Sequence, residues 1–153
     1  MERLLTIGYQ DATQAAVLDA LRAAGATVLV DVRAIAASRR PGFAKSQLAG
    51  GVASIGLPYL HLRGLGTPAD GRAAARAGQH DELRHIYGRQ LETPEAQHDL
   101  AHLAGLLRAG ERPCLLCLER QPHHCHRSMI AERMAGMLGC EVEHLTPAVP
   151  DAV

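Results

Sequence analysis

The chemically richest part of the sequence is a short segment near its carboxyl end that contains two thiols, a carboxylate, an imidazole and a guanidinium. An apolar run ends at Cys117 and Glu119, and a loop rich in Pro and His leads to Cys125, His126 and Arg127. This pattern predicts a strand that ends just before a helix begins. Because open α/β sheets place their ligands at such an edge, we expect the active or binding site here.

A thiol at the start of a helix has its thiolate stabilised by free backbone N–H groups and by the helix dipole. Cys125 is expected to occupy this position. The same N–H groups bind anions, and Arg127 could add a bidentate contact to a phosphate or carboxylate. In the alternative interpretation, Cys125 is a small packed residue and Arg127 pairs with Glu132 or Glu119.

Cys117 and Glu119 are two residues apart, so their side chains point to the same face of a strand. Glu119 either forms an ion pair that orients Arg33 or Arg127, or acts as a general base toward a thiol. We predict that Cys117, Glu119 and Cys125 carry the chemistry.

The cysteine spacing also raises the possibility of metal binding, because Cys114, Cys117, Cys125 and His126 together make a Cys3His set. Residues three apart on a strand point to opposite faces, so Cys114 and Cys117 could share an ion only if the strand bent. We therefore assign no metal ligands. Two alternatives stay open: a redox pair of Cys117 with Cys125, and a smaller metal site that combines these two with His123, His124 or His126.

Further polar residues are expected near the same edge. Arg33 follows a strand directly, and the next loop contains Ser38, Arg39 and Phe43. Clustered arginines with one aromatic ring could hold a phosphate and a base, although Phe43 could equally fill the core. Tyr9 and His61 also come at strand ends. The expected substrate- or anion-binding residues are Tyr9, Arg33, Ser38, Arg39, His61, His126 and Arg127.

Strands and helices alternate along the chain. The hydrophobic pattern predicts strands at 4–8, 27–32, 57–61, 114–118 and 141–145. It predicts helices at 11–24, with Asp11 as the N-cap, and at 46–54, 81–91, 94–109 and 127–138. Residues 63–78 are expected to form a mobile loop. The fold class is therefore α/β: a single doubly wound domain over residues 1–146 with a mostly parallel sheet, and a frayed tail at 147–153.

Composition limits the classes of function. The chain has 153 residues, enough for one domain, and its 16 basic and 16 acidic residues create no overall field that attracts nucleic acid or membrane. Three of the four Cys lie within twelve residues beside His, which favours thiol or metal chemistry over a secreted disulfide scaffold. No apolar segment is long enough to span a membrane, and no signal region precedes the first strand, so we expect a cytoplasmic protein without membrane partners.

Several short motifs follow one another in a specific order. They are Thr6-Ile7-Gly8-Tyr9, Val30-Asp31-Val32-Arg33, Ser38-Arg39 with Pro41-Gly42-Phe43, Pro58-Tyr59 with His61, Leu65-Gly66, Cys117 with Glu119, and Cys125-His126-Arg127. In this order the chain resembles the family known as domain of unknown function, number 488. The resemblance implies a small cytoplasmic, mainly prokaryotic α/β domain with no settled reaction, some members of which carry loose DNA-repair labels. It also implies a polar signature of Arg33, Arg39, Cys117, Glu119, Cys125, His126 and Arg127. Cys114, His123 and His124 depart from the family pattern and inherit no role.

Three functional hypotheses follow. In the first, the protein is an enzyme for an anionic or phosphate-bearing substrate, with a nucleotide or nucleic acid favoured. In the second, it is a non-catalytic module that binds nucleotide or nucleic acid through the same arginines. In the third, it is a metal-stabilised interaction domain. The sequence identifies neither a cofactor nor an oligomeric state.

Overall fold

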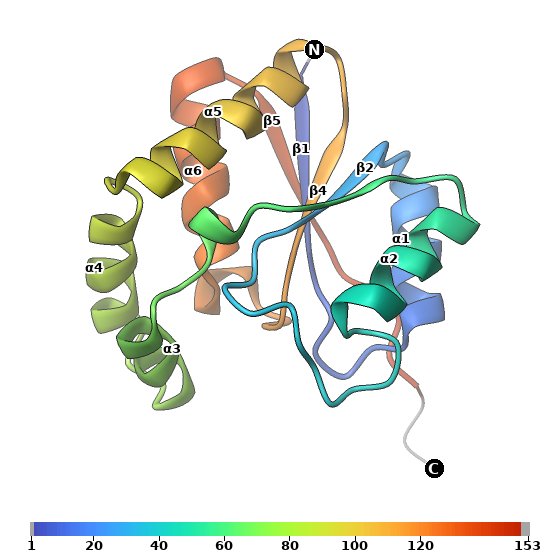
Figure 1. The fold of residues 1–153 in the computed structure, drawn as a ribbon, viewed down its shortest axis with the longest axis horizontal. Helices are drawn as coiled ribbons and strands as arrows, with labels where there is room; N and C mark the ends of the chain where they lie inside the picture. Colours follow the sequence, from blue (N-terminus) through green and yellow to red (C-terminus); the bar gives the residue numbers. More distant parts are fainter. Residues whose placement is uncertain (1, 151–153) are drawn as a thin grey trace.

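Five parallel strands form the centre of the protein (Figure 1). The computed structural model describes residues 2–150. The strands are β1 (Arg3–Gly8), β2 (Val28–Asp31), β3 (Tyr59–His61), β4 (Pro113–Cys117) and β5 (Glu141–Leu145), in the spatial order β3-β2-β4-β1-β5. Every residue of β2 and β4 is buried, as expected for parallel strands that are covered on both faces.

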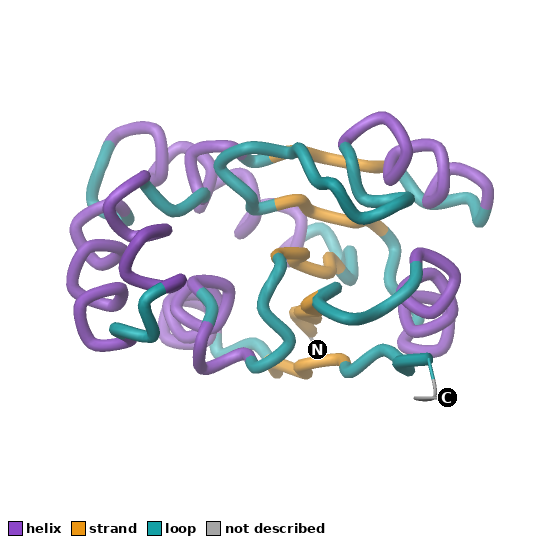
Figure 2. The backbone as a smooth tube through the Cα atoms, turned by 90° about the horizontal axis from the view of Figure 1, so that it is seen from below, coloured by secondary structure: helices purple, strands orange, loops and turns teal. Residues whose placement is uncertain are grey.

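Helices cover both faces of the sheet, as Figure 2 shows. They are α1 (Gln14–Ala24), α2 (Lys45–Ser54), α3 (Ala69–Arg76), α4 (His80–Gln90), α5 (Pro94–Arg108) and α6 (His126–Leu138), with short 3-10 helices at Arg63–Leu65 and Pro122–His124. Helices α1 and α2 pack on one face, and α5 and α6 pack on the other. Within residues 2–150, no helix is both long and apolar enough to cross a membrane.

The core has two main parts, one on each face of the sheet, and β4 contributes to them alternately. Cys114 and Leu116 pack with residues of α1 and α2, whereas Leu115 and Cys117 pack with residues of α5 and α6. The expectation that Cys114 and Cys117 point to opposite faces is therefore confirmed. Cys117 lies on the face that α6 covers.

After β1 and after β4, the chain turns to opposite faces of the sheet. Strand β1 leads into α1, and its neighbour β4 leads into α6 on the other side. A crevice opens outside the carboxyl ends of two parallel strands where such a divergence occurs. In this protein the divergence lies where Gly8 is paired with Cys117.

The predicted α/β class is confirmed, a strand occurs within each of the five predicted segments, and the sheet is wholly rather than mostly parallel. The loop prediction for residues 63–78 was wrong, because this segment contains α3. Pro68 precedes α3, Asp70 lies in its first turn, and Ala74 packs against α4. The N-cap assignment of Asp11 was also wrong: the Thr13 hydroxyl accepts the hydrogen bond from the backbone of Ala16. The expected frayed tail, 147–153, lies partly outside the described residues.

The end of β1 approaches the loop after β4 so closely that no side chain fits there. A Cβ atom built on Gly8 would lie 1.8 Å from the carbonyl oxygen of Glu119 and 2.9 Å from Nη1 of Arg127. Gly8 is therefore required for the contact between β1, the Glu119 backbone and α6.

We predict that Gly8→Ala destabilises the protein by about 3 kcal/mol or more, because backbone must move to admit the methyl group. Chemical denaturation monitored by circular dichroism measures the change. The matched control is Gly105→Ala in the exposed face of α5, where no atom lies within 4 Å of the new Cβ. That substitution should stabilise the helix by roughly 1 kcal/mol. Equal stability of the two variants would contradict the close approach.

Candidate functional site: a cysteine pair at the carboxyl edge of the sheet

A cavity of about 230 Å³ lies at the carboxyl edge of the sheet. Its wall includes residues that follow β1, β2 and β4, one side of α3, and the first residues of α6. Apolar side chains such as Ile35 and Leu118 line part of this wall, and both are exposed. The cavity therefore lies where the sequence pattern predicted the site.

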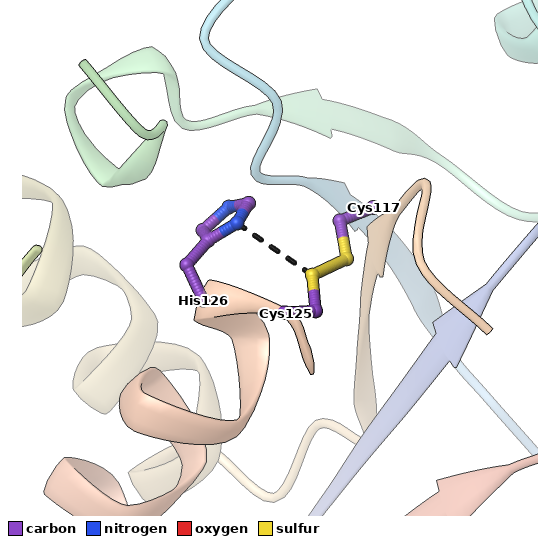
Figure 3. Close-up of side chains that lie close together, drawn as sticks. All are labelled: Cys117, Cys125 and His126. Carbon is purple, nitrogen blue, oxygen red and sulfur yellow. Dashed lines mark hydrogen bonds between the residues drawn. A yellow bond between two sulfur atoms is a disulfide. The ribbon is translucent and has the colours of Figure 1, made fainter. Parts of the chain in front are cut away.

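Two sulfur atoms lie together in the wall of this cavity. Cys117 is the last residue of β4, Cys125 is the N-cap residue of α6, and the two are joined as a disulfide (Figure 3). Both residues are buried, at 1% and 4% exposure. The pairing considered from the sequence is thus present, and its use in a reaction stays a prediction.

Arg127 contacts the cysteine pair but does not line the cavity. Its side chain is 0% exposed, and its Nη1 donates a hydrogen bond to Cys117 Sγ over 3.2 Å. The same Nη1 also donates to the Glu119 carbonyl, while Nε donates to Thr6 Oγ1 and Nη2 to the Arg120 carbonyl. Burial lowers the pKa of Arg127 to about 10, so the group stays a cation near neutral pH.

The buried charge of Arg127 has no carboxylate partner among residues 2–150. Glu132 pairs instead with Arg84 at 3.1 Å. Glu119 contributes only its carbonyl oxygen. The ion pairs considered from the sequence are therefore not formed, and the anion-binding role predicted for Arg127 stays untested.

A chain of hydrogen bonds links Arg127 to the far edge of the sheet. Thr6 Oγ1 accepts from Arg127 Nε at 3.1 Å and lies 2.5 Å from His144 Nδ1 on β5. Because the threonine oxygen already accepts from the arginine, we assign its own hydrogen to the imidazole nitrogen. Burial lowers the pKa of His144, which favours the neutral ring that this arrangement needs.

His126 faces the other sulfur. Its Nε2 lies 2.7 Å from the Val32 carbonyl oxygen, and its Nδ1 lies 3.6 Å from Cys125 Sγ (Figure 3). A carbonyl only accepts hydrogen bonds, so Nε2 carries the hydrogen and the lone pair of Nδ1 points toward the sulfur. Burial lowers the pKa of His126 to about 4, so the imidazole is neutral near pH 7.

Glu119 lines the same cavity through a half-buried carboxyl group. Burial raises its pKa, although His124, Arg127 and His80 partly oppose this shift. No ion pair with Glu119 occurs among residues 2–150. The ion pair considered from the sequence is therefore not formed, and the role of Glu119 as a general base stays a prediction.

Arg33 lines the cavity, but its donors have partners inside the protein. Its guanidinium forms a bidentate pair with Asp31, at 2.9 and 2.7 Å, and donates to the Phe43 carbonyl and to Tyr9 Oη. Tyr9 stacks on Phe43, whose side chain is wholly buried. Phe43 therefore fills the core. The predicted ligand roles of Arg33 and Tyr9 stay untested, although both residues reach the cavity.

Three predicted residues do not line the cavity. Ser38 accepts a hydrogen bond from the backbone of Arg40, and Arg39 is exposed on the same loop. His61 Nε2 lies 2.7 Å from the Arg33 carbonyl oxygen. The structure thus brings together Tyr9, Arg33, Cys117, Glu119, Cys125 and His126, with Arg127 behind them, and leaves Ser38, Arg39 and His61 outside the cavity wall.

Sequence reasoning missed the two arginines of α3 in the cavity wall. Arg72 and Arg76 of α3 line it, and so does His124, whose ring stacks on that of His80 at 4.1 Å. The available signal was the spacing of Arg72 and Arg76, four residues apart in an Ala-rich segment, which places both on one face of a helix. The loop prediction for residues 63–78 concealed it.

We predict that protonation of His126 lowers the free energy of unfolding as the pH falls. Its pKa is about 4 in the folded protein and 6.5 in the unfolded chain, so the unfolded chain binds the proton first as the pH falls. Stability should therefore be fully present above pH 6.5 and decline toward pH 4, by about 3 kcal/mol.

The measurement is denaturant unfolding of the disulfide form, with chelator present, between pH 7 and pH 4. His126→Gln keeps a hydrogen-bond donor for Val32 but no titratable ring. The loss of stability in the variant should be smaller over the same range, because the other titrating groups are unchanged. An identical pH dependence in both proteins would contradict the assignment.

Comparison with known proteins places the site within a family of unassigned function. No curated protein and no solved structure matches the chain. The sequence model of one family matches residues 13–134, a range that includes both cysteines of the pair, Glu119, His126 and Arg127. Since this range covers most of the chain, the protein belongs to the family described as Domain of unknown function DUF488.

Proposed function

We propose that this protein is an enzyme that uses Cys117 and Cys125 as a redox-active pair in thiol–disulfide exchange with a small anionic substrate. One observation carries the proposal. The two sulfurs meet in the wall of a cavity, with a buried guanidinium 3.2 Å from one and a neutral imidazole nitrogen 3.6 Å from the other.

The two neighbouring groups give the cysteines different tasks in the reduced protein. Arg127 favours the thiolate of Cys117, because a desolvated cation stabilises an adjacent anion. The lone pair of His126 can accept the hydrogen of the Cys125 thiol. Cys117 is therefore the nucleophile, and Cys125 is the thiol that completes the exchange.

The reaction runs in two displacements. The Cys117 thiolate attacks one sulfur of a substrate disulfide, which forms a mixed disulfide and releases the first substrate thiolate. The Cys125 sulfur, whose hydrogen His126 Nδ1 orients, then attacks the Cys117 sulfur and closes the Cys117–Cys125 disulfide, while its proton goes to the second substrate thiolate as that thiolate leaves. The pair loses two electrons and the substrate gains them; a low-molecular-weight thiol of the reducing cytoplasm expected from the sequence reverses the change.

Glu119 fits the role of proton carrier in this exchange. Its carboxyl group lines the same cavity as the two cysteines, and burial raises its pKa above its ordinary value. A carboxylic acid of this kind can protonate a departing thiolate and recover the proton afterwards.

The basic residues of the cavity support an anionic substrate. Arg72 is half-buried and is held by its hydrogen bond to the Thr67 carbonyl, at 2.8 Å, while Arg76 and His124 are exposed. The cavity volume of about 230 Å³ is below the range of roughly 300–1,000 Å³ that is typical of ligand pockets. This size supports a small acidic molecule, or the acidic part of a nucleotide, over a strand of nucleic acid.

We predict that the reduced protein releases two equivalents of thiolate from dithiobis(nitrobenzoate) in fast, linked steps and ends with the Cys117–Cys125 disulfide. Cys125→Ser should release only one fast equivalent and accumulate the mixed disulfide at Cys117. Cys117→Ser should lose the fast phase. Stopped-flow absorbance and intact mass spectrometry measure these products.

Cys140→Ser is the matched control, since this buried thiol lies at the other end of α6. It should react like the wild type. A fast phase that survives in both Cys117→Ser and Cys125→Ser would overturn the proposal, and so would a reduced wild type that forms no internal disulfide.

We predict that the double variant Arg72→Gln, Arg76→Gln reacts roughly tenfold more slowly with anionic dithiobis(nitrobenzoate) at subsaturating concentration, because it loses charged contacts to the probe. Its rate with neutral dipyridyl disulfide should stay within about twofold of the wild type, since the sulfurs are unchanged. Arg89→Gln, an exposed residue of α4 outside the cavity wall, is the control. Equal slowing with both probes would contradict an anion-binding role for α3.

A further inference from the structure

The cysteine pair and His126 have a second possible use that disulfide chemistry does not need. Cys117 Sγ, Cys125 Sγ and one ring nitrogen of His126 all lie within 4.8 Å of one another. We propose that, in the dithiol form of the protein, these three residues bind one zinc ion and leave its fourth position open to the cavity. This inference uses the same residues as the proposed function but does not rest on the exchange reaction.

The separation of the ligand atoms fits a tetrahedral ion. Zinc binds thiolate sulfur at about 2.3 Å and imidazole nitrogen at about 2.1 Å, so two such ligands lie roughly 3.6 Å apart. The observed distance from His126 Nδ1 to Cys125 Sγ is 3.6 Å. Reduction frees the Cys117 sulfur to take the third position.

The imidazole is already prepared as a metal ligand. His126 is neutral, its Nε2 hydrogen is used by the Val32 carbonyl, and its Nδ1 lone pair faces the sulfurs. Metal-binding histidines commonly have this arrangement, in which a backbone carbonyl holds the ring and fixes its tautomer.

The charges of the site also balance. Two thiolates neutralise one divalent ion, which makes its burial feasible, and Arg127 donates an N–H hydrogen bond to the Cys117 ligand. Thiolate and imidazole ligands favour zinc over the hard cations that prefer oxygen. Three protein ligands with one open position are typical of catalytic rather than structural zinc sites. Glu119 lines the same cavity as Cys117, Cys125 and His126.

Zinc binding and disulfide formation exclude each other, because both use the same two sulfurs. A small-molecule disulfide acts as the two-electron oxidant: it accepts two electrons, becomes two thiolates, and leaves the Cys117–Cys125 disulfide and a free zinc ion. The bound ion is thereby released whenever the pair is oxidised.

The test uses full-length, tag-free protein purified under reducing conditions without chelator. Elemental analysis should find roughly one zinc per chain, and replacement by Co²⁺ should give the thiolate-to-cobalt absorption and the intense visible bands of a tetrahedral site. Cys117→Ser, Cys125→Ser and His126→Gln should each lose most of the metal and both sets of bands. Cys140→Ser and His124→Asn should keep them.

Circular dichroism first establishes that each variant is folded. Zinc at wild-type stoichiometry in folded Cys117→Ser and Cys125→Ser would overturn the proposal, since the metal would then be bound elsewhere. Reduced wild type that takes up neither zinc nor Co²⁺ would overturn it as well.

Addition of dithiobis(nitrobenzoate) separates the two proposals. Release of one zinc per disulfide formed supports both. Fast disulfide formation by a protein that never binds metal refutes the zinc site and leaves the exchange reaction standing. A zinc-bound protein that forms no internal disulfide, even after the metal is removed, refutes the exchange reaction and leaves the zinc site standing.

Discussion

A buried cation without a carboxylate partner is the constraint on which the carboxyl edge of this sheet depends. Removing the Arg127 guanidinium from water is costly unless its donors find acceptors. Four acceptors provide this, from β1, from the last residue of β4, and from the loop after it. One acceptor lies on β1 and the other three lie between Cys117 and Arg120, so Arg127 fixes β1, the end of β4 and the start of α6 relative to one another. Gly8 is part of the same constraint, because any side chain there would separate the strand from both Glu119 and Arg127.

The contrast with Arg33 shows why the missing carboxylate matters. Arg33 is buried to a similar degree, but its charge is matched by Asp31, which also accepts a hydrogen bond from Tyr59 over 2.5 Å. Within that ion pair the two charges compensate each other, so the pair has little electrostatic effect on neighbouring groups. The charge of Arg127 is compensated only by dipoles, and the polarisable group nearest to it is the Cys117 sulfur. A thiolate at Cys117 would provide the negative charge that Arg127 otherwise lacks. The same burial that makes Arg127 costly therefore favours ionisation of Cys117.

The sequence predicts the fold well, because local patterns determine it: continuous apolar runs indicate buried parallel strands, and the alternation of strands with helices indicates the α/β class. It also places Cys117, Glu119, Cys125 and His126 at one edge, since the ends of parallel strands meet there. It does not reveal which arginines are internal. Arg33 and Arg127 look like ligands because they follow a strand and begin a helix, and only the tertiary contacts show that their donors are already occupied. Helix α3 was missed because its few buried residues pack on α4 rather than on the sheet, so its apolar periodicity is weak.

The environments of the two sulfurs differ in a way that a purely structural disulfide does not need. Cys117 contacts a cation that cannot give up its proton at neutral pH, whereas Cys125 faces a neutral imidazole nitrogen that can accept a hydrogen bond from its thiol. Arg127 favours the thiolate form of Cys117, and His126 orients the hydrogen of the Cys125 thiol until that sulfur reacts. If the disulfide were permanent, Cys117 would never be a thiolate and Cys125 would never carry a hydrogen. The free-energy cost of burying Arg127 and His126 would then have no benefit in return. The asymmetry has a use only when the bond opens. Opening it also frees both sulfurs beside an imidazole lone pair, so a site built for exchange is one that can also hold a metal ion.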